Sequence, residues 1–381
     1  MRLLLDVSAV PARPVGAGVY TVELARELDR RAEIELHLVS RRDDEDRWRG
    51  LAPGASVHAE VPPARPARLA WEQTRAPRLA TRLGAEVWHG PHYTLPLRLS
   101  TPSVVTVHDL TFFEHPEWHE RSKVAFFRTM IKSSTARAGA IVAVSGHTRD
   151  RLESVLHPRP PVFVAQHGVD HDRFTTVDAV GTADDLARLA AIGVRAPYLA
   201  FAATLEPRKD VPSLIDAFAR LAPRHRDLTL VIAGRDGWGA LAVRDAAAQS
   251  GCTTRIARVG WMDDAILPAF FRQAEAVAYP SLEEGFGLPA LEALACGAAL
   301  VTTSGSAMEE VVGDAAVLVR PRDPGALATA IERVLVDRTE RDRLRAAGPR
   351  RAAEFTWAAS VDQHLAAYER ARTAPEGKVG G

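Results

Sequence analysis

The sequence predicts an α/β protein with two main domains, each a doubly wound parallel sheet covered by helices on both faces. Short apolar runs that fit buried strands alternate with amphipathic stretches that fit helices, and the alternation continues through both halves of the chain. The apolar run 276–279 ends at Pro280, as a buried parallel strand is expected to end. A length of 381 residues, of which 46% are hydrophobic and 25% charged, suits two or three globular domains.

Composition and charge argue against several classes of protein. The 48 Lys and Arg residues balance the 48 Asp and Glu residues, so no overall field favours nucleic acid. Cys252 and Cys296 are the only cysteines, which supports neither a disulfide framework nor a cysteine metal site. The first apolar run breaks at Asp6, too early for a signal peptide, and no window approaches the roughly 18 apolar residues of a membrane span. We therefore expect a cytoplasmic protein.

Residues 1–172 are expected to form the first domain. Gly16 and Gly18 precede its first helix and would let the backbone come close to a phosphate or sugar. They make a weak dinucleotide fingerprint, because Thr21 stands where a third glycine is expected. The expected strands are 3–7, 34–39, a strand ending within 86–93, 104–109, 140–145 and 162–165, and the expected helices are 19–31, 123–138 and one that begins at Thr148.

Two acidic segments contain an Asp-x-Asp triplet, which can hold a divalent metal where it ends a hydrophobic strand. Residues 43–46 have no such strand before them and are predicted to be a solvated loop. Of the triplet 170–172, only Asp170 comes near a strand. We predict no metal site.

The segment 62–82 places five arginines around apolar residues and Trp71. Two interpretations fit this pattern. It is either a solvated helix, shortened by Pro66 and Pro77, or a surface that lies on an anionic membrane.

Histidines follow two predicted strands of the first domain. His89 and His92 follow one of them, and His108-Asp109 ends the β-branched run 104–107. The carboxyl ends of parallel strands line the ligand crevice of a doubly wound sheet, so these histidines are expected to face it. A structural role in the core is the alternative. The next segment, 112–118, is predicted to be a loop.

Residues 173–196 lose the strand pattern and are interpreted as a linker with a short helix. The second domain is expected to span 197–355, followed by a C-terminal helix at 356–372 and a disordered tail at 373–381. Its expected strands are 198–204, 228–234, 256–260, 276–279, 299–303 and 315–319, with a helix at 211–221.

The stretch 279–297 reads as a strand end, a glycine-bearing loop and a helix. Pro289 fits the first helical turn and Gly297 the position after the helix. Glu284 and Glu292, eight positions apart, can both face a cleft at the amino-terminal end of that helix. This end attracts a phosphate, while carboxylates accept hydrogen bonds from sugar hydroxyls. The pair therefore suggests a nucleotide sugar, whereas the plain alternative is two surface glutamates.

A second pair of charged residues, Arg208 and Lys209, lies in a loop between a predicted strand and a predicted helix. Two cations in such a loop are placed to neutralise a diphosphate leaving group. The alternative is ordinary surface charge.

Four motifs resemble those of retaining glycosyltransferases of family 4. The segment E-G-F-G-L-P-A-L-E-A at 284–293 resembles the E-x7-E signature of that family, and P-R-K at 207–209 resembles its diphosphate motif. V-T-V-H-D at 105–109 resembles its strand-end histidine, and H-G-V-D at 167–170 its crossover segment, with His167 where Asn is common. Ala203 replaces an arginine that many members carry, and Glu309 replaces the usual proline.

The resemblance covers nearly the whole chain and implies the GT-B fold, two Rossmann-like domains with a last helix that returns to the first. It implies that Glu284 contacts the donor sugar and that Glu292 holds the ribose. It also implies that His108 positions the sugar while Arg208 and Lys209 meet the diphosphate. The donor site would further include Gly16, Gly18, Gly285, Phe286, Gly287 and Leu288. It would also include Trp261, whose ring either packs in the protein or stacks on the nucleobase.

The implied function is sugar transfer from a nucleotide donor to an acceptor hydroxyl, with retention and without a metal or other cofactor. The motif style is similar to GDP-mannose-dependent members, with a UDP- or dTDP-sugar as the alternative donor. The acceptor would be a glycan, a glycolipid or a phosphoinositide-type molecule, and lipid-linked acceptors would fit membrane contact through 65–82. A catalytically silent sugar-nucleotide-binding protein would be expected to lose Lys209, Glu284 or Glu292, and this chain keeps all three. An epimerase or phosphorylase would lack the pairing of P-R-K with E-x7-E.

Overall fold

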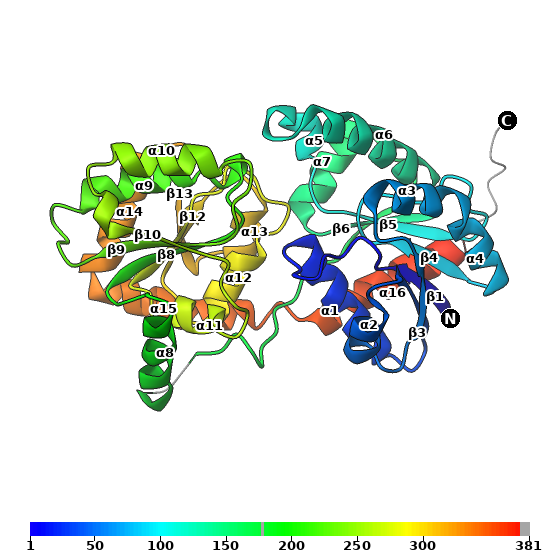
Figure 1. Cartoon of the computed structure of the whole chain (residues 1–381), viewed down its shortest axis with the longest axis horizontal. Helices are drawn as coiled ribbons and strands as arrows, with labels where there is room; N and C mark the ends of the chain where they lie inside the picture. The colour runs from blue at the N-terminus through cyan, green and yellow to red at the C-terminus, as the bar shows by residue number, and fades with distance from the viewer. Residues whose placement is uncertain (177–178, 374–381) are drawn as a thin grey trace. The chain divides into compact units, whose positions relative to one another are not determined.

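The computed structural model describes residues 1–176 and 179–373. The chain divides into two compact units, which are described separately (Figure 1). Unit 1 comprises residues 1–168 and 356–381, and unit 2 comprises 169–355. The predicted boundary at 172 thus falls four residues later than the boundary in the structure, and most of the predicted linker is the helix α8 (Ala179–Ala191). The predicted tail lies outside the described residues, except that Thr373 ends the last helix.

Unit 1 is built on a seven-stranded parallel sheet with the order β3-β2-β1-β4-β5-β6-β7. The strand order reverses direction between β1 and β4, which are paired with each other. From this pair, β2 and β3 follow on one side of the sheet and β5, β6 and β7 on the other. The strands are β1 (Arg2–Asp6), β2 (Glu35–Arg41), β3 (Ser56–Val61), β4 (Val87–Gly90), β5 (Ser103–Val107), β6 (Ala140–Ala143) and β7 (Val162–Val164).

Helices cover both faces of this sheet (Figure 1). They are α1 (Ala17–Asp29), α2 (Glu45–Leu51), α3 (Arg65–Thr74), α4 (Ala76–Arg82), α5 (Thr111–Glu114), the 3-10 turn η1 (Pro116–Trp118), α6 (Arg121–Arg137), α7 (Gly146–Leu156) and α16 (Trp357–Thr373). The C-terminal helix α16 contacts α1 and strands β4, β5, β6 and β7, so the last helix belongs to the first unit.

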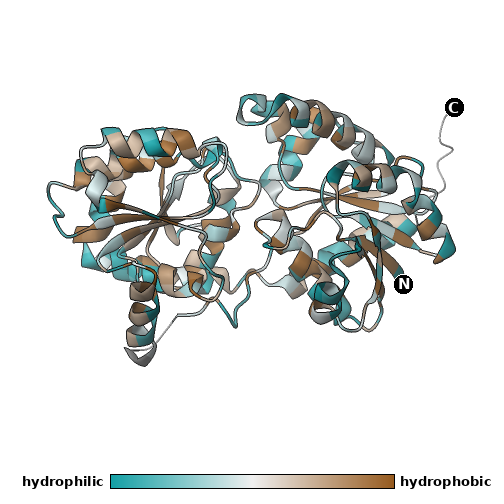
Figure 2. Ribbon diagram, viewed as in Figure 1, coloured by the Kyte–Doolittle hydropathy of each residue, from teal (hydrophilic) through white to brown (hydrophobic). Residues whose placement is uncertain are grey.

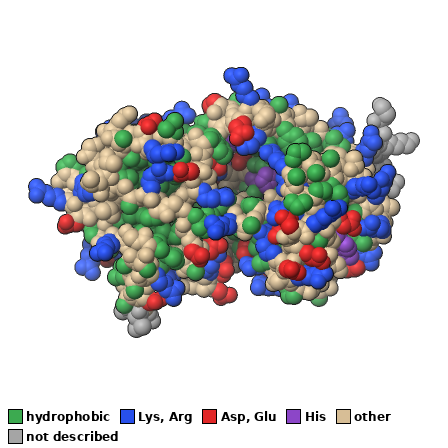
Figure 3. Space-filling view, in the orientation of Figure 1, with side chains coloured by type: hydrophobic (Ala, Val, Ile, Leu, Met, Phe, Trp, Pro, Cys, Tyr) green, Lys and Arg blue, Asp and Glu red, His purple; other side chains and the backbone are tan. Residues whose placement is uncertain are grey.

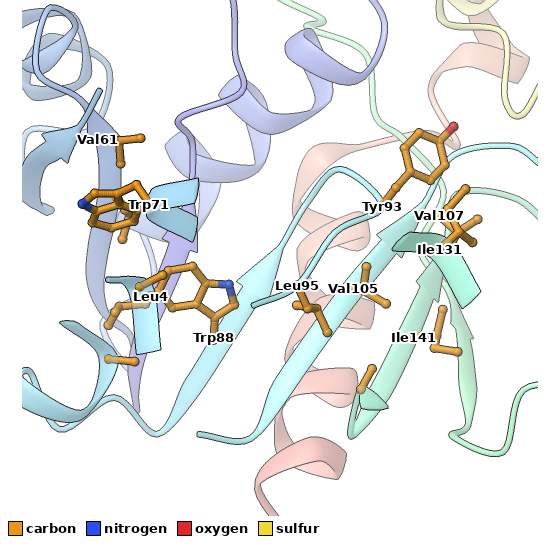
Figure 4. Close-up of a cluster of buried hydrophobic side chains, with 14 of the residues drawn as sticks. Leu4, Val61, Trp71, Trp88, Tyr93, Leu95, Val105, Val107, Ile131 and Ile141 are labelled. Carbon is orange, nitrogen blue, oxygen red and sulfur yellow. The ribbon is translucent and has the colours of Figure 1, made fainter. Parts of the chain in front are cut away.

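The core of unit 1 lies between the sheet and its helices. Trp88 and Leu4, both without exposed surface, pack with Trp71 from α3 and with branched side chains of β5 and β6 (Figure 4). The strands are mostly apolar, and the helices turn their apolar sides toward them (Figure 2). The central strands β4, β5 and β6 are buried on both faces, which explains why they read as mostly apolar runs.

Unit 2 repeats the plan with a six-stranded parallel sheet of order β10-β9-β8-β11-β12-β13, in which the order reverses between β8 and β11. Its strands are β8 (Tyr198–Ala202), β9 (Thr229–Ala233), β10 (Ile256–Gly260), β11 (Ala276–Tyr279), β12 (Leu300–Thr303) and β13 (Ala316–Val319). Beside α8, its helices are η2 (Pro207–Lys209), α9 (Val211–Leu221), α10 (Ala240–Gln249), η3 (Thr253–Arg255), α11 (Leu267–Arg272), α12 (Leu288–Ala295), α13 (Ala307–Val312), α14 (Pro324–Val336) and α15 (Arg338–Ala352). The predicted α/β class is confirmed.

Two predicted loops are wrong. Residues 45 and 46 begin helix α2, and Asp44 just before it is buried rather than solvated. Its carboxylate accepts a hydrogen bond from the indole of Trp48 at 3.0 Å and pairs with Arg41 and Arg47. The segment 112–118 forms α5 and η1, because Phe112 stacks on Phe127 at 4.5 Å between ring centroids and is held in the core.

The arginine-rich segment 62–82 forms α3 and α4. Pro66 and Pro77 lie in the first turns of these helices, where a missing N–H costs nothing, and so they divide the segment instead of breaking it. Arg82 pairs with Glu60, while Arg65, Arg75 and Arg78 are exposed.

Candidate active site

Two loops of unit 2 follow the strands at which its sheet order reverses. Leu205 to Lys209 follow β8, and Pro280 to Gly287 follow β11. In open α/β sheets the ligand crevice lies at this reversal, outside the carboxyl ends of the strands. The two loops are joined by a hydrogen bond from Leu282 N to Arg208 O at 2.7 Å. The sequence motifs P-R-K and E-x7-E therefore meet at one position of the fold.

Glu284 is the centre of this position. Its side chain is only 7% exposed and forms ion pairs with both cations of the other loop. Arg208 Nη1 donates to Glu284 Oε2 at 2.7 Å, and Lys209 Nζ donates to Oε1. Lys209 also donates to the hydroxyl of Tyr279, and Arg208 Nε donates to Glu206 Oε2 at 2.8 Å. The structure brings Arg208, Lys209 and Glu284 together.

Charge pairing decides the protonation of Glu284. Burial alone would raise its pKa, but the charges of Arg208 and Lys209 outweigh burial and lower the pKa to about 2. Glu284 is therefore ionised at neutral pH. Two cations and two carboxylates are close to electrically balanced, so an anion that binds here must compete with Glu284 and Glu206 for the two cations.

Glu292 behaves in the opposite way. It lies in α12, is buried, and its carboxyl group has no hydrogen-bond or ion-pair partner among residues 1–176 and 179–373. Burial raises its pKa to about 8, which the charge of Arg173 opposes and that of Asp264 reinforces. A buried carboxyl group without a partner can accept from or donate to hydroxyl groups of a ligand.

The loop before α12 depends on glycine. Gly287 has φ of 104°, and a Cβ atom there would lie 2.2 Å from the sulfur of Met308. Gly285, Phe286 and Leu288 are buried beside it, and the ring of Phe286 packs edge-on against Phe355. Gly287 precedes the first turn of α12 and provides no side-chain cap, so the amino-terminal end of the helix lacks a capping side chain.

Trp261 follows β10 and is half-buried. The guanidinium carbon of Arg235 lies 5.7 Å from the centre of its ring. Sequence reasoning had no signal for Arg235, since it belongs to neither motif.

The remaining predicted residues lie in unit 1. His108 follows β5, is 8% exposed, and its Nε2 donates to the carbonyl of Pro91 at 2.8 Å. Burial lowers the pKa of His108, although that hydrogen bond and Asp109 act against the shift. Gly16, with φ of 50°, immediately precedes α1 and is exposed, whereas Gly18 lies within α1 and packs against Pro14.

A buried network in unit 1 was not predicted from sequence. His89 Nε2 lies 2.8 Å from Thr106 Oγ1, and its Nδ1 lies 2.8 Å from the hydroxyl of Tyr368. The hydroxyl of Tyr20 lies 2.8 Å from Thr106 Oγ1 and 2.7 Å from His364 Nε2. These hydrogen bonds attach α16 to β4, β5 and α1. His89 therefore has the structural role that the sequence left open.

The described residues contain no group of three or more His, Cys, Asp and Glu that could hold a metal ion. Within the same part of the chain, every helix is too short or too polar to cross a membrane. On the face of the molecule shown in Figure 3, basic and acidic side chains are interspersed.

Comparison with solved structures supports the fold. Sucrose-phosphate synthase from Thermosynechococcus elongatus aligns with a TM-score of 0.78 and 19% identity, over 98% of this chain and all of its own. Anabaena Alr3699/HepE, solved in complex with UDP-glucose, aligns with a TM-score of 0.76 and 18% identity, over 97% of this chain and 98% of its own. The chain has the GT-B fold.

Sequence comparison identifies relatives among transferases. O-antigen chain mannosyltransferase B of Escherichia coli is 29% identical over 74% of this chain and 74% of its own length. D-inositol 3-phosphate glycosyltransferase of Stackebrandtia nassauensis is 32% identical over 61% of this chain and 54% of its own length. The model of glycosyltransferase family 4 matches residues 14–173, and that of glycosyl transferases group 1 matches 189–351. The chain therefore belongs to the group 1 and family 4 glycosyltransferases.

Proposed function

We propose that this glycosyltransferase transfers mannose from GDP-mannose to a hydroxyl group of a glycan, with retention at the anomeric carbon and without a metal ion. The observation that carries the proposal is the cluster of the buried Lys209 and Glu284 with the partly buried Arg208 at the reversal point of unit 2. Cations at this point of a doubly wound sheet are suited to a diphosphate, and a carboxylate beside them is suited to sugar hydroxyls.

Donor binding would rearrange the ion pairs of the cluster. The diphosphate takes Arg208 and Lys209 from Glu284, because two phosphate groups carry more negative charge than one carboxylate. Glu284 then accepts hydrogen bonds from the hydroxyls of the donor sugar. The uncapped amino-terminal end of α12 adds a further attraction for the phosphate groups. Glu292 holds the ribose hydroxyls.

In the transfer step, the bond between the anomeric carbon and the diphosphate oxygen breaks, and its electron pair leaves with the nucleoside diphosphate. Arg208 and Lys209 stabilise the charge that develops on this leaving group. The acceptor oxygen forms its bond to the anomeric carbon on the face that the diphosphate leaves. Its proton goes to a diphosphate oxygen. His108 positions the donor sugar, and no protein nucleophile takes part.

The names of the relatives favour mannose and a glycan acceptor. The E. coli relative is named as an O-antigen chain mannosyltransferase, while the inositol phosphate relatives favour a phosphorylated polyol as the second acceptor class. A UDP- or dTDP-sugar is the alternative donor, and the HepE structure contains UDP-glucose. If the acceptor is lipid-linked, Arg65, Arg75 and Arg78 on the exposed sides of α3 and α4 would contact anionic headgroups.

Slow donor hydrolysis tests the proposal. The purified protein would be incubated with GDP-mannose, UDP-glucose, UDP-N-acetylglucosamine or dTDP-rhamnose in the presence of EDTA, beside the double variant Lys209→Ala, Glu284→Ala. We expect hydrolysis and a higher melting temperature with GDP-mannose alone, both lost in the double variant. Hydrolysis of one of the other nucleotide sugars instead would identify that nucleotide sugar as the donor. Binding without hydrolysis or transfer, with every donor and in the presence of a glycan acceptor, would favour a silent sugar-nucleotide-binding protein.

A further inference from the structure

A loop of unit 2 outside both sequence motifs lies beside Leu205, in the segment that leads to Arg208 and Lys209. This loop, residues 234–239, follows β9 and leads into α10. Leu205 N donates to Arg235 O at 3.0 Å, and Gly239 N donates to Leu205 O at 2.9 Å. At its other side, Gly234 N donates to Gly260 O at 2.6 Å, directly before Trp261. The loop thus connects the segment that leads to Arg208 and Lys209 with the end of β10.

The backbone of this loop packs closely against the segment that follows β8. A Cβ atom on Gly234, whose φ is 134°, would lie 1.8 Å from the carbonyl oxygen of Ala203, and one on Gly237 would lie 2.6 Å from that of Leu205. Only glycine permits these contacts. The backbone on either side of Arg235 therefore packs directly against the segment before Arg208.

The guanidinium of Arg235 is available for a ligand. It lies over the ring of Trp261, and no carboxylate or carbonyl in the described part of the chain pairs with it. The neighbouring Asp236 is instead paired with Arg258 and, at 3.9 Å, with Arg244. An aromatic ring beneath a guanidinium orients its plane and leaves its N–H groups free to donate in that plane.

We propose that Arg235, oriented by Trp261, reads the base of the donor nucleotide and selects guanine. This inference rests on the proposed function, since it requires a nucleoside diphosphate at Arg208 and Lys209. Guanine presents two adjacent acceptors, O6 and N7, which match two parallel N–H groups of a guanidinium. Uracil and thymine present only O4 beside a C–H or a methyl group, and adenine places a donor beside its N7. A paired guanidinium fork therefore discriminates among the bases.

Calorimetric titration of the full chain with GDP, 7-deaza-GDP and UDP tests this role. For the native protein we expect GDP to bind most tightly, with 7-deaza-GDP about tenfold weaker because one charged hydrogen bond is lost. Arg235→Ala is expected to weaken GDP at least tenfold, to leave UDP within about twofold, and to bind GDP and 7-deaza-GDP equally. Arg235→Lys keeps the charge but not the fork, and is expected to lose the preference for GDP over 7-deaza-GDP.

Arg244→Ala, which removes an exposed arginine from the same region, serves as the matched control and is expected to bind all three nucleotides as the native protein does. Equal weakening of GDP and UDP by Arg235→Ala, or no weakening of either, would overturn the role in base selection and leave the proposed function standing. Tighter native binding of UDP than of GDP would overturn it as well. If the native protein bound none of the nucleotides, both the inference and the proposed function would fall.

Discussion

Units 1 and 2 share one plan but contain different chemistry at the reversal points of their sheets. In unit 2, Arg208, Lys209 and Glu284 form a charged cluster that follows β8 and β11. In unit 1 the order reverses between β1 and β4, and histidines occur in or after β4 and its neighbour β5. His108, which follows β5, is buried and bonded to a backbone carbonyl. The scaffold therefore fixes where a ligand can lie, while the loops that follow the strands fix its chemistry. The charged unit is suited to the nucleoside diphosphate.

The largest effect is expected for Lys209→Ala. Removing the buried ammonium leaves Glu284 with one cation and the departing diphosphate with less charge stabilisation, so the rate of transfer should fall about 10²–10³-fold. Arg220→Ala, which removes an exposed arginine of α9 paired with Asp216, is the control and should leave the rate unchanged. Steady-state kinetics with GDP-mannose and the acceptor measure both. Equal rates for the two variants would show that Lys209 contributes no more to transfer than an ordinary surface charge does.

His108→Ala separates the two units by function. Because we assign His108 to the sugar and not to the diphosphate, the variant should lose about tenfold to a hundredfold in the rate of transfer while its affinity for GDP is unchanged. Calorimetry with GDP and kinetics with the complete donor give the two values. A parallel loss of GDP affinity would show that the histidine belongs to nucleotide binding or to folding.

Acid should unfold unit 1 before unit 2. Burial lowers the pKa of His364 and His92 to about 4, and that of His89 well below its ordinary value, so the unfolded chain binds more protons than the folded one below about pH 6.5. As the pH falls from about 6.5 to the pKa of the folded state, each such histidine lowers the folding equilibrium constant up to about tenfold per pH unit. Glu284 of unit 2, with its pKa of about 2, loses its contribution only below about pH 4.

Hydrogen exchange at pH 7, 5.5 and 4.5 measures this order. Faster exchange is expected first in α16 and β4, whose side chains form the histidine network. Earlier opening of β8 and β11 would contradict the assignment of the acid-sensitive groups to unit 1.

The smallest effect is expected for Glu292→Gln. The pKa of Glu292 is raised to about 8 in the folded protein, whereas a glutamate of the unfolded chain titrates near about 4. The folded state therefore binds more protons between these pH values, and the native protein loses stability as the pH rises from about 4 to 8. The glutamine variant should therefore melt several degrees above the native protein at pH 8.5 and close to it at pH 5. Thermal unfolding at the two pH values measures the difference. A variant that melts lower at pH 8.5 would show that the carboxylate is paired.

Much of the fold and of the site could be predicted from local pattern. The strands of unit 2 other than the edge strand β10 are mostly apolar and buried. The motif residues Arg208 and Glu284 lie in the loops after the adjacent strands β8 and β11, so strand order brings these loops together. Contacts without a local signal could not be predicted. Tyr368 and His89 are 279 residues apart, and Arg235 belongs to neither motif. The burial of Asp44 was missed because a run of acidic residues does not reveal its arginine and tryptophan partners.

Hydrogen exchange with and without GDP shows whether the nucleoside diphosphate binds to unit 2. We expect GDP to slow exchange in residues 205–210 and 280–291 of unit 2, and this protection to be lost in Lys209→Ala but kept in Arg220→Ala. Protection confined to the loops of unit 1 around Gly16 and His108, with residues 205–210 unchanged, would contradict this expectation.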